Sequence, residues 1–345
     1  MREQLVMGKL IRGSGLTELP GQANSSWSAL RSGKRKLSQR THQSNRPIAK
    51  AGDHTGEEEA EIVTVFLYMH GNAFSRGQGH RTDLYKMLRE LYPSCYVATF
   101  DYRGYADSEG TPTEEGVIQD GLAMFEWVVT YLSRHHSMSS HERSSTAPSC
   151  HVQVILWGHS LGTAVSSAVA EKVSGQPHLR KHLGGLVLEA PFSDIVSASI
   201  GYSYFKHIFK NFLGEQYSTT IAQYALHPHL QFHTKNRIRD IMCPVLICHG
   251  ERDSEIHCSH SEILFDHLRG DDDLEGRWDR DDVNHGESTL EVGRSRRGFP
   301  VYMLTMANGS HNNLCTFPIL YTYLSHFLLE CDDYLPASTA DHDPI

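Results

Sequence analysis

A single serine between two glycines stands out among the residues that could do chemistry. Ser160 lies in the stretch WGHSLG (157–162), which contains the pattern GxSxG. The apolar, β-branched run HVQVIL precedes it, and the small-residue run TAVSSAVA follows it. A strand, a sharp turn and a helix in this order lift a serine hydroxyl above a sheet, and the helix N-terminus offers N–H groups to a developing oxyanion. The pattern predicts that Ser160 is a nucleophile rather than an ordinary turn hydroxyl.

A serine nucleophile needs a base, and the base needs an acid to orient it. Asp253 follows the apolar run CPVLICHG, and His311 follows the run FPVYMLTM after a short loop containing glycine. Serine, then acid, then histidine is the chain order found in hydrolases of the α/β type. Asp194, just past the run LVLEAPF, is the alternative acid, and Glu251 is a weaker third candidate. The expected catalytic residues are therefore Ser160, Asp253 and His311.

The stretch HGNA (70–73) follows another apolar run, IVTVFLYM. Backbone N–H groups of Asn72 and Ala73 could provide one part of an oxyanion hole, and the N–H of Leu161 could provide the other. A simple strand-ending turn is the alternative interpretation. Because HGNA and GHSLG occur together and in this order, we favour the oxyanion role. That role uses the backbone, so the side chain of Asn72 need not touch a substrate.

The elements that must position these groups alternate along the chain. Strands are predicted at six apolar runs, and helical patterns separate most of them; the runs cover 62–69, 95–102, 151–156, 186–189, 244–249 and 301–306. Strands that are apolar throughout imply a parallel sheet covered by helices on both faces. Ligands of such sheets bind beyond the carboxyl ends of the strands, where the candidate residues fall. The predicted fold class is α/β, with a mostly parallel central sheet.

The sequence also predicts how the chain is divided. Residues 1–60 are polar and basic and read as a disordered leader, 61–331 as the catalytic domain, and 332–345 as a flexible tail. Within the domain, about 194–242 is rich in aromatic residues and predicts a helical lid over the strand ends, with an ordinary packed cap as the alternative. About 270–298 is an acidic insertion, which we expect to be a solvated loop.

Composition sets limits on the class of protein. A net charge of -9, with 39% hydrophobic and 21% charged residues, is typical of a globular protein and gives no reason to expect nucleic acid as a partner. The seven cysteines favour free thiols, although Cys243 and Cys258 could pair. No apolar run of about eighteen residues predicts a membrane span, and the N-terminus lacks the pattern of a secretory signal.

Motifs for metals and cofactors are missing from the sequence. The many histidines show no HExxH spacing, and neither GxGxxG nor a Walker loop occurs. The acidic insertion lacks the regular ligand spacing of an EF-hand. We therefore expect no metal site and no cofactor.

Four motifs together resemble the abhydrolase-domain-12 family of membrane-associated serine hydrolases, which act on lysophosphatidylserine and monoacylglycerol. The motifs are LYMHGNAFSRGQGHRTDLYKML, FDYRGYADSEGTPTEEG, LWGHSLGTAVSSAVAE and LVLEAPFSDI, and the resemblance covers about residues 62–330. It implies the α/β-hydrolase fold, with the nucleophile at Ser160, the acid at Asp253 and the base at His311.

This chain departs from the family pattern in three places. The family carries a transmembrane helix before its catalytic domain, where this chain has a polar leader. The loop from Asp253 to His311 carries the acidic insertion, and SEIHC follows Asp253 where relatives tend to have a turn containing Pro and Val. These departures bear on membrane anchoring and on how His311 meets its partners.

The leading hypothesis is a hydrolase that cleaves the acyl ester of monoacyl lipids, such as lysophosphatidylserine or monoacylglycerol, through an acyl-Ser160 intermediate. The alternatives are a protein palmitoyl thioesterase and a catalytically inactive hydrolase fold that binds lipids or proteins. The expected partners are a monoacyl lipid and a membrane surface. The resemblance implies association with the endoplasmic reticulum membrane, while the absence of a span or signal in this chain leaves a soluble, cytoplasmic location open.

Overall fold

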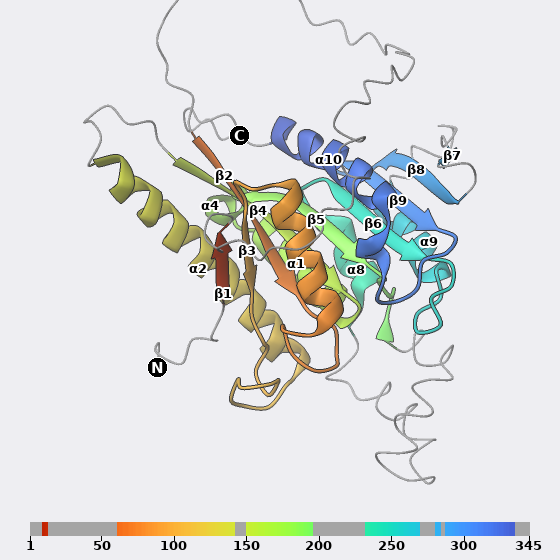
Figure 1. Ribbon diagram of the computed structural model, residues 1–345, viewed down its shortest axis with the longest axis horizontal. Helices are drawn as coiled ribbons and strands as arrows, with labels where there is room; N and C mark the ends of the chain where they lie inside the picture. The colour runs from red at the N-terminus through yellow and green to blue at the C-terminus, as the bar shows by residue number, and fades with distance from the viewer. Residues whose placement is uncertain are drawn as a thin grey trace, which may run out of the picture. The chain divides into compact units, whose positions relative to one another are not determined.

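The computed structural model describes residues 9–12, 61–141, 150–195, 232–269, 280–283 and 287–334. Within them, nine strands form one sheet in the order β1-β3-β2-β4-β5-β6-β9-β8-β7 (Figure 1). The strands are β1 (Lys9–Arg12), β2 (Glu61–Met69), β3 (Tyr96–Thr99), β4 (Cys150–His159), β5 (Leu183–Glu189), β6 (Val245–Gly250), β7 (Arg280–Val283), β8 (Ser288–Arg294) and β9 (Pro300–Met306). The helices are α1 (Gly79–Leu91), α2 (Glu114–His141), α3 (Leu161–Ser174), α4 (Pro177–Arg180), α8 (Thr234–Arg237), α9 (Ser259–Leu268) and α10 (Pro318–Asp333), with the 3-10 turns η2 (Ile238–Asp240) and η4 (Leu314–Thr316).

The middle of the sheet is parallel and its edges are antiparallel. Strands β3, β2, β4, β5, β6 and β9 pair in parallel, whereas β1 joins β3, β8 joins β9 and β7 joins β8 in the antiparallel sense. The six parallel strands are those predicted from the apolar runs. The predicted α/β class with a mostly parallel sheet is therefore confirmed.

Alternate residues of each central strand enter two separate hydrophobic clusters. In β2, Val65 and Leu67 join a cluster with residues of α2, α3 and α9, while Phe66 and Tyr68 join a second cluster with α1 and α10. Successive side chains of a strand point to opposite faces. A strand buried on both faces must be apolar at every position, which explains the unbroken apolar runs.

Strand register brings the predicted site residues to one edge. Met69 of β2 lies opposite Gly158 of β4, and His159 of β4 lies opposite Glu189 of β5. On the other side, Gly250 of β6 lies opposite Met306 of β9. The loops that follow β2, β4, β6 and β9 therefore all start at the carboxyl edge of the sheet, as expected for an α/β protein.

Three strands were not predicted, and they correct two of the expectations. Residues 9–12, placed in the disordered leader, form β1 on the edge of the sheet. The acidic insertion at 270–298 is not only a loop, because it contains β7 and β8. In the run STLEVGR, Ser288 and Leu290 are buried and alternate with half-buried residues, which is the pattern of a strand with one covered face. The rest of the leader and the centre of the predicted lid, residues 196–231, lie outside the described residues.

Two further expectations concern thiols and membrane spans. All seven cysteines are free, so Cys243 and Cys258 do not form a disulfide. Among the helices in the described part of the chain, none is both long enough and apolar enough to cross a membrane. Helix α10 continues to Asp333, two residues into the predicted tail, and residues 335–345 are outside the described ranges.

Candidate active site

Ser160 occupies the turn between β4 and α3 in an unusual backbone conformation. Its φ of 53° and ψ of -118° lie in a region that residues with a side chain rarely adopt. The Ser160 N–H donates to the Glu189 carbonyl over 3.0 Å, and the Thr163 hydroxyl donates to the Ser160 carbonyl over 2.6 Å. The turn is thus fixed from both sides, with the serine side chain only half-buried.

The glycines of GxSxG are required by close backbone packing. A Cβ at Gly158 would lie 2.3 Å from the Gly162 carbonyl oxygen, and a Cβ at Gly162 would lie 1.9 Å from the Met69 carbonyl oxygen. Both approaches are far below van der Waals contact. The spacing of the motif therefore follows from how tightly α3 starts against β4 and against the end of β2.

His311 and Asp253 meet in the loops after β9 and β6. The Nδ1–H of His311 donates to Asp253 Oδ2 over 2.7 Å. The other oxygen, Oδ1, accepts the backbone N–H groups of Glu255 at 2.7 Å and Ile256 at 2.8 Å. His249 Nε2 lies 3.3 Å from Oδ2. The carboxylate is buried and held on every side, so the orientation of the His311 ring is fixed by it.

These contacts set the protonation of the pair. Burial by itself would raise the pKa of Asp253, but hydrogen bonds from His249 and His311 hold that pKa well below its usual range. Burial would also lower the pKa of His311, whereas the hydrogen bond and charge of Asp253, with the charges of Glu255 and Glu189, raise it. An ionised Asp253 only accepts hydrogen bonds, so the neutral His311 keeps its proton on Nδ1 and presents a free lone pair at Nε2.

His159 connects the serine turn to the histidine loop. Its Nε2–H donates to the His311 carbonyl over 2.8 Å, and the two rings are 4.9 Å apart. Ser160 follows His159 directly in the chain. No hydrogen bond joins Ser160 to His311 in this structure, and His311 Nε2 lies 3.5 Å from Glu255 Oε2. Catalytic hydrogen bonds are often long until a substrate is bound.

Asp194, the alternative acid, lies in a different cluster. It accepts a hydrogen bond from the Ser193 hydroxyl over 3.3 Å and lies 3.4 Å from Lys235 Nζ. Ser193 in turn contacts His260 Nδ1 at 3.0 Å. The structure therefore brings His311 together with Asp253 and not with Asp194.

The HGNA loop lies against the serine turn. A Cβ at Gly71 would be 3.2 Å from Ser160 Cβ and 3.2 Å from His159 Nδ1. The Asn72 side-chain oxygen accepts a hydrogen bond from the Tyr105 hydroxyl over 2.7 Å. Leu161 is the first residue of α3, where helix N–H groups have no partner within the helix.

Two buried residues beside the serine were missed by the sequence analysis. Glu189 ends β5 and accepts a hydrogen bond from Trp157 Nε1 over 2.9 Å; burial, only partly offset by this bond, raises the pKa of Glu189 to about 7. Burial and the charge of His311 lower the pKa of His159 well below its usual value, so this histidine is neutral. The one available signal for Glu189 was an acidic residue ending an otherwise apolar strand.

Comparison with known proteins gives a consistent picture. No family model matches the chain. The lysophosphatidylserine lipase ABHD12 of Danio rerio is 33% identical over 204 residues, which are 59% of this chain and 46% of that protein. ABHD12 of Mus musculus is 35% identical over 195 residues, or 55% of this chain and 41% of that one. Protein ABHD12B of Homo sapiens is 32% identical over 207 residues, which are 59% of this chain and 50% of that protein. The chain spans about half the length of these relatives.

A solved structure supports the fold. The Pyrococcus furiosus esterase Pf2001 superposes with a TM-score of 0.50 at 14% identity, covering 78% of this chain and 81% of that one. At this identity the likeness bears on the fold alone. The predicted resemblance is confirmed: this chain has the α/β-hydrolase fold and is similar, over more than half of its length, to the ABHD12 lysophosphatidylserine lipases.

Proposed function

We propose that this protein is a serine hydrolase that cleaves the acyl ester of monoacyl lipids, with lysophosphatidylserine and monoacylglycerol as its substrates. The observation that carries the proposal is the strained Ser160 turn beside the hydrogen-bonded His311 and Asp253, at the carboxyl edge of the sheet. Similarity to proteins named as lysophosphatidylserine lipases supports the substrate class.

In the proposed reaction, Ser160 Oγ attacks the ester carbonyl and its proton passes to His311 Nε2. The resulting imidazolium is stabilised by the ionised Asp253. The developing oxyanion is stabilised by backbone N–H groups of Asn72, Ala73 and Leu161. This assignment favours Asp253 over Asp194, because Asp253 is the carboxylate that binds His311 Nδ1.

The rest of the cycle uses the same groups. The C–O bond to the glycerol oxygen breaks, and His311 gives its proton to the departing alcohol. This leaves an acyl-Ser160 ester. A water molecule then attacks this ester, with His311 accepting its proton and returning it to Ser160 Oγ as the fatty acid leaves.

Fatty-acid release by the purified full chain tests the proposal. Lysophosphatidylserine, monoacylglycerol and a palmitoyl thioester would be compared as substrates. We expect release from the glycerol lipids, complete loss of it in Ser160→Ala, and normal release in Ser167→Ala. Ser167 is a suitable control because it is buried in the same helix and its hydroxyl has no partner among the described residues. Release from the thioester alone would contradict the proposal and indicate a protein thioesterase. Folded protein that releases no fatty acid from any substrate would favour the inactive binding module.

We further infer that the protein binds its substrate at a membrane surface, because monoacyl lipids partition into bilayers through their acyl chain. Co-sedimentation with vesicles containing lysophosphatidylserine tests this, and protein that stays in the supernatant while still active would contradict it. Residence at the endoplasmic reticulum remains a prediction from the resemblance, to be checked by fractionation of cells.

A further inference from the structure

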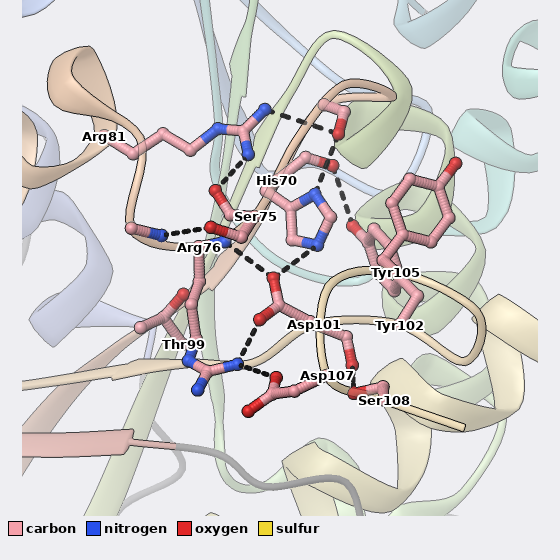
Figure 2. A network of polar contacts seen from close by, with 12 residues as sticks. His70, Ser75, Arg76, Arg81, Thr99, Asp101, Tyr102, Tyr105, Asp107 and Ser108 are labelled. Carbon is pink, nitrogen blue, oxygen red and sulfur yellow. Dashed lines mark hydrogen bonds and ion pairs between the residues drawn. The ribbon is translucent and has the colours of Figure 1, made fainter.

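The loop between β2 and α1 turns several of its backbone carbonyls toward one buried arginine. Arg81, in the first turn of α1, is 2% exposed. Its Nη2 donates to the Ala73 carbonyl over 2.8 Å and makes a longer contact of 3.4 Å with the Gly71 carbonyl. Its Nη1 donates to the Ser75 carbonyl, as Figure 2 shows. One side chain therefore holds three carbonyls of the loop that contains HGNA.

The bonds to Arg81 determine which way the loop N–H groups face. All described peptide bonds are trans, and in a trans peptide the C=O and the next N–H point in opposite directions. With the carbonyls of Gly71 and Ala73 turned to Arg81, the N–H groups of Asn72 and Phe74 face away from it. His70 Nδ1–H reinforces the first of these by donating to the Gly71 carbonyl over 2.8 Å.

The loop needs such support because its backbone is strained at Phe74. This residue has a φ of 61°, which is unfavourable for a bulky side chain. Its side chain is 74% exposed, so side-chain packing does little to maintain the conformation. The hydrogen bond from Arg81 to the neighbouring Ala73 carbonyl helps to maintain this strained backbone conformation.

The charge of Arg81 is also unusual. Among the described residues, no carboxylate lies within ion-pair distance of it; Asp101 instead pairs with Arg76 and lies 3.3 Å from His70 Nε2. A guanidinium is always ionised, so Arg81 places a positive charge beneath the loop. Its field reaches the neighbouring His80, whose pKa is lowered to about 4 by burial first and then by Arg81.

We propose that Arg81 is a positioning residue for oxyanion stabilisation: it holds the β2–α1 loop with the Asn72 N–H directed toward the Ser160 turn, and its positive charge favours negative charge on the other side of the loop. The geometry that supports this is the position of Gly71: a Cβ added to it would lie 3.2 Å from Ser160 Cβ, and its carbonyl contacts Arg81 at 3.4 Å. The inference rests on the proposed hydrolase function and adds a residue to it.

Kinetics of Arg81→Met and Arg81→Lys in the full chain test the proposal, with a soluble short-chain ester as substrate. Loss of an interaction that forms only in the transition state lowers kcat and leaves KM nearly unchanged. We expect kcat to fall about 100-fold in Arg81→Met, as when one oxyanion donor is lost, with KM within about threefold. Arg81→Lys keeps the charge but not the forked geometry, so it should recover part of the lost rate.

A tetrahedral-adduct inhibitor supplies the readout that a merely structural role would not affect. Binding of a trifluoromethyl ketone should weaken in Arg81→Met by the same factor as kcat. Arg103→Met is the matched control, because Arg103 pairs with Asp120 at 2.6 Å and touches neither the loop nor Ser160 in the described structure. Its kcat and inhibitor binding should stay within about threefold of the original protein.

Three results would overturn the inference. The first is a folded Arg81→Met protein with unchanged kcat, and the second is a parallel loss of kcat and rise of KM without weaker inhibitor binding. If Arg81→Met does not fold, the test uses Arg81→Lys instead. An unchanged kcat and an unchanged inhibitor affinity in Arg81→Lys would then be the third result that overturns the inference. Failure of the proposed function is distinguishable, because the original protein would then show neither turnover nor labelling of Ser160 by a fluorophosphonate, and both proposals would fall together.

Discussion

At the scale of single residues, Glu255 tunes the proposed base. Its Oε2 lies 3.5 Å from His311 Nε2, and its negative charge is one of the causes that raise the pKa of His311. The other acids that act on His311 are Asp253 and Glu189. Glu255 belongs to the SEIHC segment that directly follows Asp253.

We expect Glu255→Gln to shift the pH dependence of kcat/KM toward lower pH. Removing the carboxylate lowers the pKa of His311, and the base works only when neutral, so the variant should stay active at pH values where the original protein has lost its activity. At pH values above the pKa of His311 in both proteins, the rates should agree within about twofold. Glu251→Gln, an exposed acid of the same loop, serves as control, and identical acid limbs for Glu255→Gln and the original protein would refute the expectation.

The sequence was sufficient to name candidate residues from a motif or a place in the chain, and insufficient for residues whose proposed role rests on contacts. Ser160, Asp253 and His311 were named from patterns that follow predicted strands, and the structure brings the last two within 2.7 Å. Arg81 and His159 lie inside the quoted motifs, but the motif spacing does not predict their contacts. Their importance depends on carbonyls of distant or irregular segments, which no spacing rule describes.

At the scale of elements, the start of α3 against the end of β2 is the tightest constraint on the serine turn. The Met69 carbonyl oxygen occupies the place where a side chain at Gly162 would begin, only 1.9 Å from an ideal Cβ. Since the obstacle is backbone, it cannot rotate away as a side chain could. Any residue larger than glycine must push α3 from the sheet, and Ser160 moves with it.

We therefore expect Gly162→Ala to destabilise the protein by about 3 kcal/mol, at the upper end for overpacked cores, and to abolish Ser160-dependent labelling by a fluorophosphonate. Gly175→Ala, at the other end of the same helix, is the matched control: its nearest neighbour would be 3.7 Å from the new Cβ, and its φ is -75°. That change should alter stability by less than about 1 kcal/mol. Equal thermal unfolding midpoints for the two variants would disprove the steric argument.

The existence of the central elements was predictable from hydrophobic patterns, but not every boundary was. The stretch TPTEEG offers two threonines as candidate caps for α2, and the helix begins at Glu114 with Thr113 Oγ1 accepting the Gly116 N–H over 3.1 Å. Each threonine can cap a helix with the same chemistry. Which one does so depends on how the preceding loop packs, and a local pattern does not contain that information.

At the scale of the whole molecule, the described strands of the acidic insertion, β7 and β8, belong to the sheet. Strand β8 pairs along its entire length with β9, from Ser288↔Met306 to Arg294↔Pro300, and Leu290 packs into the cluster that contains Leu304. Strand β9 leads directly to the loop of His311. This role was not predictable, because a neighbouring run of acidic residues dominated the composition and the partner strand had to be known first.

Two changes to the insertion should therefore have opposite results. Replacing residues 270–298 with a short Gly-Ser linker removes β7 and β8 and leaves the apolar β9 as an unprotected edge, so we expect aggregation or loss of cooperative unfolding. It also removes the hydrogen bond from the Ala307 N–H to the Glu287 carbonyl, which ties the start of the His311 loop. Replacing only 271–279 with nine Gly and Ser residues keeps both strands and should leave kcat/KM within about twofold. Thermal unfolding and ester hydrolysis are the measurements, and a stable, fully active 270–298 replacement would show that β7 and β8 are not needed to protect β9.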